Sequence, residues 1–304
     1  MDREAAEKFD RAADAMSYDS LDERYMHLVQ KLGGTSADYI CDLAEIGPGD
    51  HVLDLGTGTG LGVRTAARRT GSTGRVVGLD LSPGLIEVAK RHTESEWCEY
   101  VVGDAEDLPF EAETFDVVFT YCAVAHFPRL DVALSQMRRV LKPGGRVVVS
   151  FVHTRPIERR SLALHYARRV VQKLLEPIRP TLFAPATALA ACDHHLPELD
   201  EPVHTPWSLG DRTHILLDAV AEAGFVDVRP RVEHRDVEFD DPDEFLEAQE
   251  AIASEVRVRM QQGDRSAAER TRAEVVERAR TALRSGGRLI YPFGAYCVFG
   301  RKPA

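Results

Sequence analysis

The stretch HVLDLGTGTGLG, from His51 to Gly62, decides the fold of this chain. Its apolar start, Val52–Leu55, predicts a short strand, and a turn with alternate glycines follows at the strand's carboxyl end. Open α/β sheets bind their ligands at that edge. Glycines let backbone amides come close to a ligand and tolerate positive φ. The stretch therefore predicts a strand and turn that bind a nucleotide-like ligand.

Two common nucleotide motifs do not fit this turn. A dinucleotide fingerprint needs Gly-x-Gly-x-x-Gly, but the sixth position is Leu61 when counted from Gly56 and Val63 when counted from Gly58. A phosphate-binding P-loop needs Gly-Lys-Ser/Thr, which does not follow the turn. The sequence argues against both a dehydrogenase and a P-loop nucleotidase.

Strand and helix patterns alternate on both sides of the turn. This alternation requires crossover connections, so it predicts a parallel, doubly wound α/β sheet covered on both faces. The triplet Val147–Val149 has no polar alternation and predicts a strand that is buried on both faces. The predicted strands are 52–55, 75–79, 99–102, 115–120, 146–152, 225–232 and 291–299, and the main predicted helices are 62–69, 83–92, 130–141, 162–175, 212–223 and most of 243–284.

The remaining chain divides into four predicted parts. The N-terminal part reads as helices with a break at Gly33-Gly34, and the prolines between Pro177 and Pro206 exclude a long helix or a central strand there. The parts are an N-terminal helical cap (1–49), a cofactor-binding core (50–153), a helical, proline-rich lid (154–211), and a C-terminal completion of the sheet (212–304) with a helical insertion at 243–285.

The composition of the chain limits its expected size class, binding partners and cellular location. With 304 residues, 44% of them hydrophobic, the chain is long enough for one large α/β core plus a smaller layer. Its formal net charge of −11 opposes the basic face that nucleic acid requires, so we expect no nucleic-acid partner. Five cysteines without a Cys-x-x-Cys pair favour a reducing cytoplasm. No apolar run is long enough for a membrane span, and no leader pattern is present.

Two acidic segments lie downstream of the turn. Asp80 ends the next predicted strand, where a carboxylate accepts hydrogen bonds from both hydroxyls of a ribose. The alternative is that Asp80 caps the helix that begins at Ser82-Pro83. The segment GDAEDLPF, from Gly103 to Phe110, follows the third strand and places an acid where it could bind an adenine amino group. On its own, this segment is only an acidic loop.

Taken in order, the motifs resemble the class I S-adenosylmethionine-dependent methyltransferases. The similarity is greatest to the small-molecule branch related to ubiquinone and natural-product methylation, and it covers about residues 50–152. The resemblance implies a seven-stranded Rossmann-like sheet whose last strand is antiparallel, with S-adenosyl-L-methionine as cofactor and S-adenosyl-L-homocysteine as product. The motifs are VLDLGTGTG, VVGLDLS, GDAEDLPF, FDVVFTYCAVAHF and RRVLKPGGRVVVS.

The resemblance also implies cofactor-binding residues. The methionine end would lie against the glycine turn and Asp54, with Tyr18 as a cover, although Tyr18 and the helix cap Asp19 could equally be structural. The ribose would lie on Asp80. The adenine would pack on Leu81, and the residues after the fourth strand would border the substrate. The expected set is Tyr18, Asp54, Gly56, Thr57, Gly58, Gly60, Asp80, Leu81, Asp104, Ala105, Thr120 and Tyr121.

Two histidines are candidate general bases. His126 and His153 both follow predicted strands on the ligand-binding edge, and histidine titrates near neutral pH. Either could instead only pack or bind backbone. Related chains often carry a pair of histidines where this chain has Ala125-His126. The segment Asp193–His195 lacks a second spaced pair of ligands, so we expect no metal.

The sequence thus predicts a cytoplasmic enzyme that transfers a methyl group to oxygen, nitrogen or carbon of a small-molecule, secondary-metabolite acceptor. Two alternatives remain open. The chain could use the bound cofactor for cyclisation, decarboxylation or hydroxylation, or it could be a non-catalytic, cofactor-binding partner protein. The acceptor and the oligomeric state, monomer or homodimer, are not fixed by the sequence.

Overall fold

The computed structural model describes residues 23–152, 180–197 and 213–304, and the chain forms two compact units. The first unit contains the described residues up to 152, 213–233 and 294–304. The second contains 180–197 and 234–293. The predicted helix at 162–175 lies outside the described residues.

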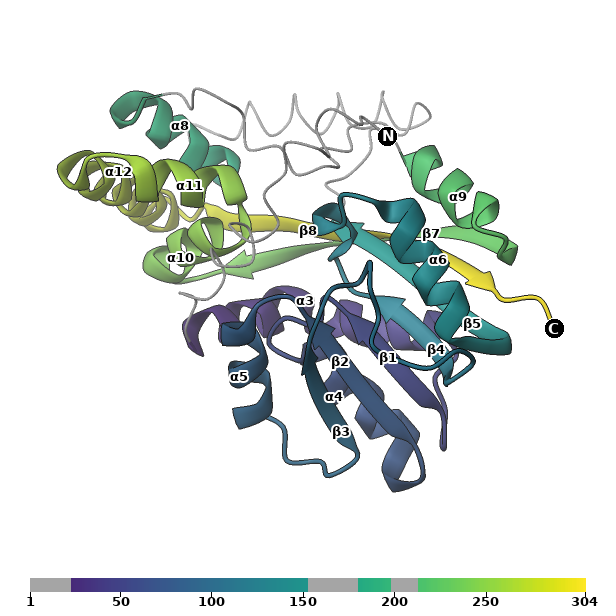
Figure 1. Ribbon diagram of the computed structural model, residues 1–304. Coiled ribbons are helices and arrows are strands. Elements are labelled where there is room, and N and C mark those ends of the chain that lie inside the picture. Colours follow the sequence, from purple (N-terminus) through teal and green to yellow (C-terminus); the bar gives the residue numbers. More distant parts are fainter. Residues whose placement is uncertain (1–22, 153–179, 198–212) are drawn as a thin grey trace. The chain divides into compact units, whose positions relative to one another are not determined.

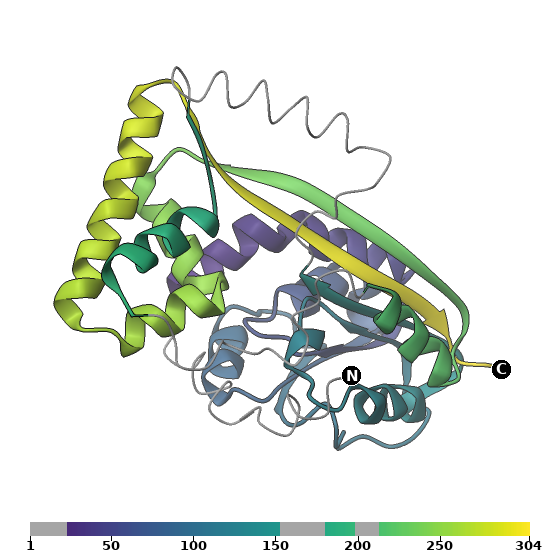
Figure 2. The same ribbon diagram turned by 90° about the horizontal axis from the view of Figure 1, so that it is seen from above.

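The first unit is built on the doubly wound sheet that the sequence predicts (Figure 1). The strand order is β3-β2-β1-β4-β5-β8, parallel up to β5, and β8 pairs antiparallel with β5. β7 lies beside β8 (Figure 2). The strands are β1 (His51–Leu55), β2 (Arg75–Asp80), β3 (Cys98–Val102), β4 (Phe115–Thr120), β5 (Leu141–Val152), β7 (Val226–Phe239) and β8 (Arg288–Arg301), the last two of which run into the second unit.

Alternating apolar side chains bury both faces of this sheet. In β5, Val147 and Val149 contribute to one core and Val148 to the other, and all three are fully buried, as predicted. α6 (Leu130–Val140) and α9 (Thr213–Glu222) contribute to the first core. The second core is covered by α3 (Glu23–Leu43) and α4 (Leu61–Thr70). α5 (Pro83–Arg91) contacts β2 and β3.

The second unit is mainly helical and has its own core of small apolar residues. β6 (Thr181–Phe183) pairs with the first residues of β8. Tight packing among the helices is possible because alanines face one another, for example Ala188, Ala191 and Ala268. The helices are α8 (Ala186–His195), α10 (Pro242–Ile252), α11 (Ser254–Gln262) and α12 (Arg265–Arg284).

One local prediction needs correction. The predicted helix break at Gly33-Gly34 is wrong, because α3 runs through both residues. Gly33 instead allows a close approach, since an added Cβ would lie 2.5 Å from Oη of Tyr121. The proline-rich segment contains a ten-residue helix, α8, which fits between Pro185 and Pro197 and does not contradict the exclusion of a long helix there.

No helix among the described residues is long and apolar enough to cross a membrane.

Candidate active site

The glycine turn after β1 is held against the end of β2. The amides of Gly56 and Thr57 both donate to the carbonyl of Leu79, at 2.8 and 3.1 Å. The amide of Gly58 donates to Oδ2 of Asp80 at 2.7 Å. α4 begins directly after this turn, so its partly positive N-terminus lies at the carboxyl edge of the sheet. The turn and Asp80 therefore form one structural element.

Three glycines in the turn have positive φ, but their surroundings differ. An added Cβ at Gly56 (φ 69°) would lie 2.3 Å from Cβ of Ala123, and one at Gly60 (φ 81°) would lie 2.4 Å from Oη of Tyr100. At Gly58 (φ 53°), an added Cβ would meet no atom of the described residues within 4 Å. Packing thus explains the first two glycines, whereas Gly58 borders open space that a ligand can occupy.

Asp54 is a buried carboxylate beneath the turn. It is 1% exposed, and its Oδ2 accepts a hydrogen bond of 2.8 Å from Oγ1 of Thr57. Burial raises the pKa of Asp54 to about 7, hydrogen bonds from Thr57 and the Val63 amide lower it in part, and nearby Asp80 raises it. Its Oδ1 is buried and has no hydrogen-bond partner among the described residues. A cationic donor would satisfy this oxygen.

Asp80 and His126 are brought close together at the carboxyl edge. Besides the Gly58 amide, Asp80 accepts a hydrogen bond of 3.0 Å from the amide of Ser82. Burial raises the pKa of Asp80, while these amides and the nearby His126 lower it. His126 ends the 3-10 turn η2 (Val124–His126) and is half-buried. The helix cap at α5 is Ser82, whose Oγ accepts from the Leu85 amide, so Asp80 is not needed for that role.

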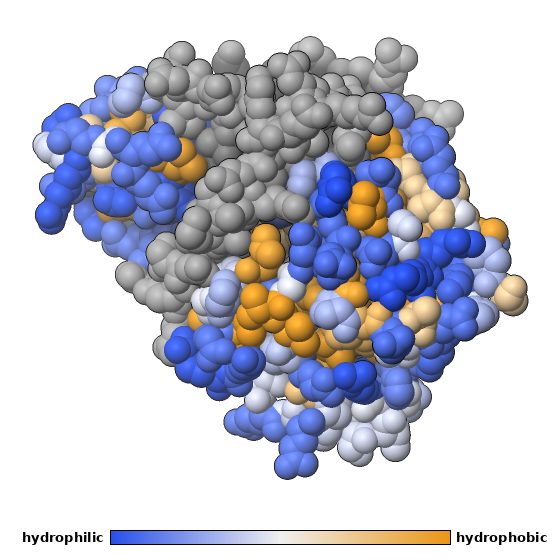
Figure 3. Space-filling model, viewed as in Figure 1, coloured by the Kyte–Doolittle hydropathy of each residue, from blue (hydrophilic) through white to orange (hydrophobic). Residues whose placement is uncertain are grey.

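The acidic loop after β3 is internally ordered. Oδ1 of Asp104 accepts a hydrogen bond of 2.8 Å from the amide of Glu106, and Ala105 is buried. Two large apolar side chains on the same sheet edge stay exposed, Leu81 at 38% and Val102 at 49%. Figure 3 shows apolar surface beside α5 among hydrophilic residues. An exposed apolar patch next to acidic groups suits a flat heterocycle with polar edges.

Ser150 of β5 holds the segment after β4 in place through hydrogen bonds. The sequence did not predict this role. Oγ of Ser150 donates to the carbonyl of Thr120 at 2.8 Å and accepts from the amide of Cys122 at 2.9 Å. Cys122 has a positive φ of 58°, which is unusual for a residue with a side chain. Oη of Tyr121 donates to the carbonyl of Gly33, which ties this segment to α3. The Thr120 hydroxyl is fully buried and has no hydrogen-bond partner in the described structure.

The remaining predicted features lie outside the described residues or in the second unit. Tyr18 and His153 lie outside the described residues. His194 and His195 both contact Glu274 in the second unit, at 3.0 and 2.9 Å, but the described residues contain no cluster of side chains able to hold a metal.

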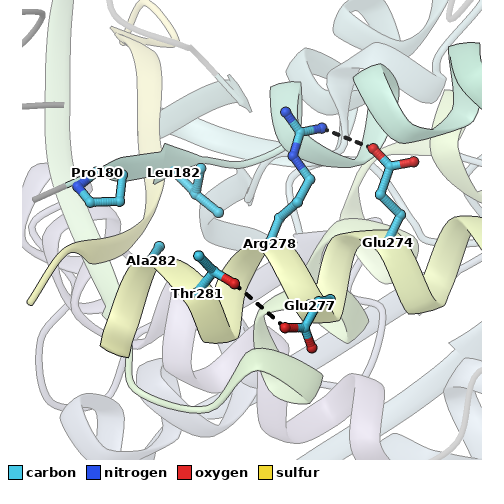
Figure 4. A pocket seen from close by; sticks show the side chains of 7 residues that line it. All are labelled: Pro180, Leu182, Glu274, Glu277, Arg278, Thr281 and Ala282. Atoms are coloured by element: carbon cyan, nitrogen blue, oxygen red, sulfur yellow. Dashed lines mark hydrogen bonds and ion pairs between the residues drawn. The ribbon is translucent and has the colours of Figure 1, made fainter. Parts of the chain in front are cut away.

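The second unit has a shallow pocket of about 420 Å³ between β6 and α12 (Figure 4). Arg278 and Glu274 form an ion pair of 3.3 Å in its wall. Pro180, Leu182 and Ala282 supply its apolar surface. None of the predicted site residues lies in this pocket, whose other lining residues are Glu277 and Thr281.

Comparison with known proteins identifies the central domain. Residues 53–149 match a family model described as a methyltransferase domain. The chain is 40% identical over 139 residues to demethylmenaquinone methyltransferase from Staphylococcus aureus (strain MRSA252), a match covering 45% of this chain and 55% of the relative. The chain thus spans about half the length of the curated relatives it matches.

Solved structures share the fold at lower identity. The YcgJ protein from Bacillus subtilis superimposes with a TM-score of 0.52 at 17% identity, covering 89% of this chain and 99% of that one. Phosphoethanolamine N-methyltransferase 2 from Haemonchus contortus, solved with phosphomonomethylethanolamine and S-adenosylhomocysteine, gives a TM-score of 0.50 at 19% identity, covering 91% and 57%. Both likenesses support the fold alone.

Proposed function

We propose that this chain, whose residues 53–149 match a family model described as a methyltransferase domain, is a class I S-adenosylmethionine-dependent methyltransferase that acts on a small molecule. The observation that carries the proposal is the single element made by the glycine turn and Asp80, linked by the Gly58 amide at the carboxyl edge of the sheet. The name of the Staphylococcus aureus relative supports a small-molecule acceptor.

The residues present fit this cofactor. In the part of the chain that the structure describes, no atom fills the space beside Gly58, and Oδ1 of Asp54 is a buried acceptor without a donor. Asp54 and Asp80 supply the negative charge that an ammonium group and a sulfonium require at close range. When bound, the cofactor supplies an electrophilic methyl group on a positively charged sulfur.

Each end of the cofactor has residues suited to hold it. Asp54 and the turn would bind the methionine end, where the N-terminus of α4 complements a carboxylate. Asp80 retains lone pairs for ribose hydroxyls after accepting two amides. Leu81 and Val102 provide exposed apolar surface for the adenine, and Asp104 lies in the following loop.

His126 is the best-placed described group to take a proton from the acceptor. It ends the turn after β4, beside Asp80, on the edge where the cofactor would lie. Methyl transfer forms a bond from the acceptor atom to the methyl carbon and breaks the carbon–sulfur bond, leaving a neutral sulfur. A hydroxyl acceptor must also lose its proton, which His126 is suited to accept, whereas positioning alone could suffice for other acceptors.

The test is to incubate the protein with methyl-labelled S-adenosylmethionine and a panel of phenols, hydroquinones, amines and activated carbon acids. We expect label in one acceptor class and an equal amount of S-adenosylhomocysteine. Asp80→Asn is the site variant, and Asp107→Asn, which removes an exposed charge from the neighbouring loop, is the matched control. Tight cofactor binding with no labelled product from any acceptor would contradict methyl transfer.

A further inference from the structure

Glu106 is a charged residue with a buried side chain. It lies in the acidic loop after β3, yet its side chain is only 2% exposed. The loop itself directs Glu106 inward, because Oδ1 of Asp104 accepts the Glu106 amide at 2.8 Å. The Asp107 amide closes the same turn on the carbonyl of Asp104 at 3.1 Å. The residue expected at the adenine edge, Asp104, therefore sets the direction of Glu106.

The carboxylate of Glu106 ends on a second loop. Its Oε1 accepts the backbone amide of Arg129 and its Oε2 accepts Nε of the same residue, both at 2.8 Å. Arg129 is the N-cap of α6 and provides no side-chain cap of its own. A carboxylate at this helix N-terminus is also favoured by the helix dipole. Glu106 therefore fixes the point at which the chain enters α6.

That point follows His126 closely. The amides of His126 and Phe127 close the η2 turn onto the carbonyls of Ala123 and Val124, at 2.9 and 3.1 Å. Little chain is left between this turn and the Arg129 anchor, so a shift of the anchor must move the turn. Ala123, in the same segment, lies within van der Waals range of Gly56 in the glycine turn. The two loops and the turn are thus packed as one group.

We propose that Glu106 is a positioning residue that couples the adenine-side loop to the turn carrying His126. This inference rests on the proposed function, because it assigns the two loops to the cofactor and the acceptor. A carboxylate is needed rather than an amide, since both of its oxygens accept hydrogen bonds. In Glu106→Gln, the amide nitrogen would face a donor, and one of the two bonds to Arg129 would be lost.

The two hydrogen bonds that Glu106 accepts, from the backbone amide and from Nε of Arg129, should contribute unequally to positioning the turn. The Arg129 side chain is 57% exposed, so water can replace its guanidinium, whereas the Glu106 side chain is 2% exposed. Arg129→Ala keeps the backbone hydrogen bond and should have a smaller effect than Glu106→Gln. Asp107→Asn, an exposed change in the same loop, is the matched control.

The test measures the affinity for S-adenosylhomocysteine and the NMR signal of the His126 ring, and neither measurement requires catalysis. Affinity for S-adenosylhomocysteine is measured by calorimetry, and the His126 ring signal is followed by NMR, assigned by its loss in His126→Gln. In the native protein and Asp107→Asn, we expect S-adenosylhomocysteine to shift this signal. In Glu106→Gln, we expect affinity about tenfold weaker, as for a lost charge-assisted hydrogen bond, and a reduced shift at saturation.

The outcomes separate the two proposals. Equal affinity and an unchanged His126 shift in Glu106→Gln would overturn the coupling. If the native protein binds no S-adenosylhomocysteine, the proposed function fails; the coupling then requires that Glu106→Gln, but not Asp107→Asn, moves the His126 signal of the free protein. If Glu106→Gln does not fold, Glu106→Asp, whose carboxylate is one methylene shorter, is measured in the same assay, and an affinity and a His126 signal equal to those of the native protein overturn the coupling.

Discussion

Replacing Asp54 with asparagine is expected to stabilise the cofactor-free protein at alkaline pH while weakening its affinity for the cofactor. Asp54 is 1% exposed, and one of its carboxylate oxygens has no hydrogen-bond partner within residues 23–152, 180–197 and 213–304. The asparagine side chain would keep an acceptor for the Thr57 hydroxyl and remove the charge. Its new amide group would lack an acceptor, which costs roughly 1–3 kcal/mol.

The magnitude follows from the pKa of Asp54, which burial raises to about 7. The unfolded chain loses this proton near pH 4, so the folded state binds more protons between about pH 4 and 7. The contribution of Asp54 to the free energy of unfolding is therefore largest below pH 4 and decreases as the pH rises to 7. The whole loss is about 4 kcal/mol, and the part between pH 5.5 and 8 is about 2 kcal/mol.

Urea unfolding of both proteins without cofactor, at several pH values, measures this effect. We expect the free energy of unfolding of the variant minus that of the native protein to increase by about 2 kcal/mol from pH 5.5 to 8. Taking the difference removes the titration of groups common to both proteins. A difference that stays constant with pH would refute the assignment of a raised pKa to Asp54.

The affinity for the cofactor should depend on pH with the opposite sign to stability, increasing as the pH rises. An ammonium group beside Asp54 favours the ionised carboxylate, so binding by the native protein should tighten from pH 5.5 to 7.5 and release a proton. Calorimetry in two buffers of different ionisation enthalpy counts that proton. At pH 8, the variant should bind S-adenosylhomocysteine about tenfold or more weakly, the value of a charge-assisted hydrogen bond. Equal affinity would place the ammonium elsewhere.

Two further predictions concern the same edge of the sheet. Asp80→Ala should weaken S-adenosylhomocysteine binding by roughly 2–4 kcal/mol in calorimetry, because it removes the acceptor for the ribose and an anchor of the Gly58 amide; unchanged affinity would exclude the ribose role. His126→Ala should lower kcat on a hydroxyl acceptor and leave cofactor affinity unchanged, measured by label transfer and calorimetry; an unaltered kcat would mean that positioning alone suffices.

The sequence predicts the sheet well because local periodicity carries that information. Strands such as β5 are apolar on both faces, and the glycines of the turn after β1 have positive φ, which is a local feature of the turn. The helix break expected at Gly33-Gly34 is wrong because the need for glycine there comes from a residue that is distant in the sequence. Tyr121, far away in the chain, donates to the Gly33 carbonyl and needs the space that a side chain would fill.

The supporting residues of the site were not predictable. Ser150 lies in an apolar strand, and nothing in its neighbours shows that it bonds both Thr120 and Cys122. Glu106 belongs to an acidic loop that reads as solvated, and its burial depends on Arg129 in another segment. Such roles arise from tertiary contacts, so a single sequence reveals the residues that form a motif but not those that hold the motif in place.

The central claim, that the glycine turn binds an adenosyl cofactor, is tested most directly by comparing Gly58→Ala with Gly71→Ala. Both glycines have positive φ, 53° and 62°, and an added Cβ at either one meets no atom of the described residues within 4 Å. Gly71 also has ψ −174°, a backbone region almost confined to glycine, so alanine there costs roughly 1–3 kcal/mol of strain and Gly71→Ala controls for backbone strain as such. Gly71 lies at the far end of α4, about 15 Å from the turn.

The measurement is the calorimetric affinity for S-adenosylhomocysteine. We expect Gly58→Ala to bind at least about tenfold more weakly than Gly71→Ala, because its methyl group occupies the space intended for the ligand. Gly71→Ala should retain the affinity of the native protein. Equal affinity in the two variants, or no binding by the native protein, would contradict a cofactor site at this turn.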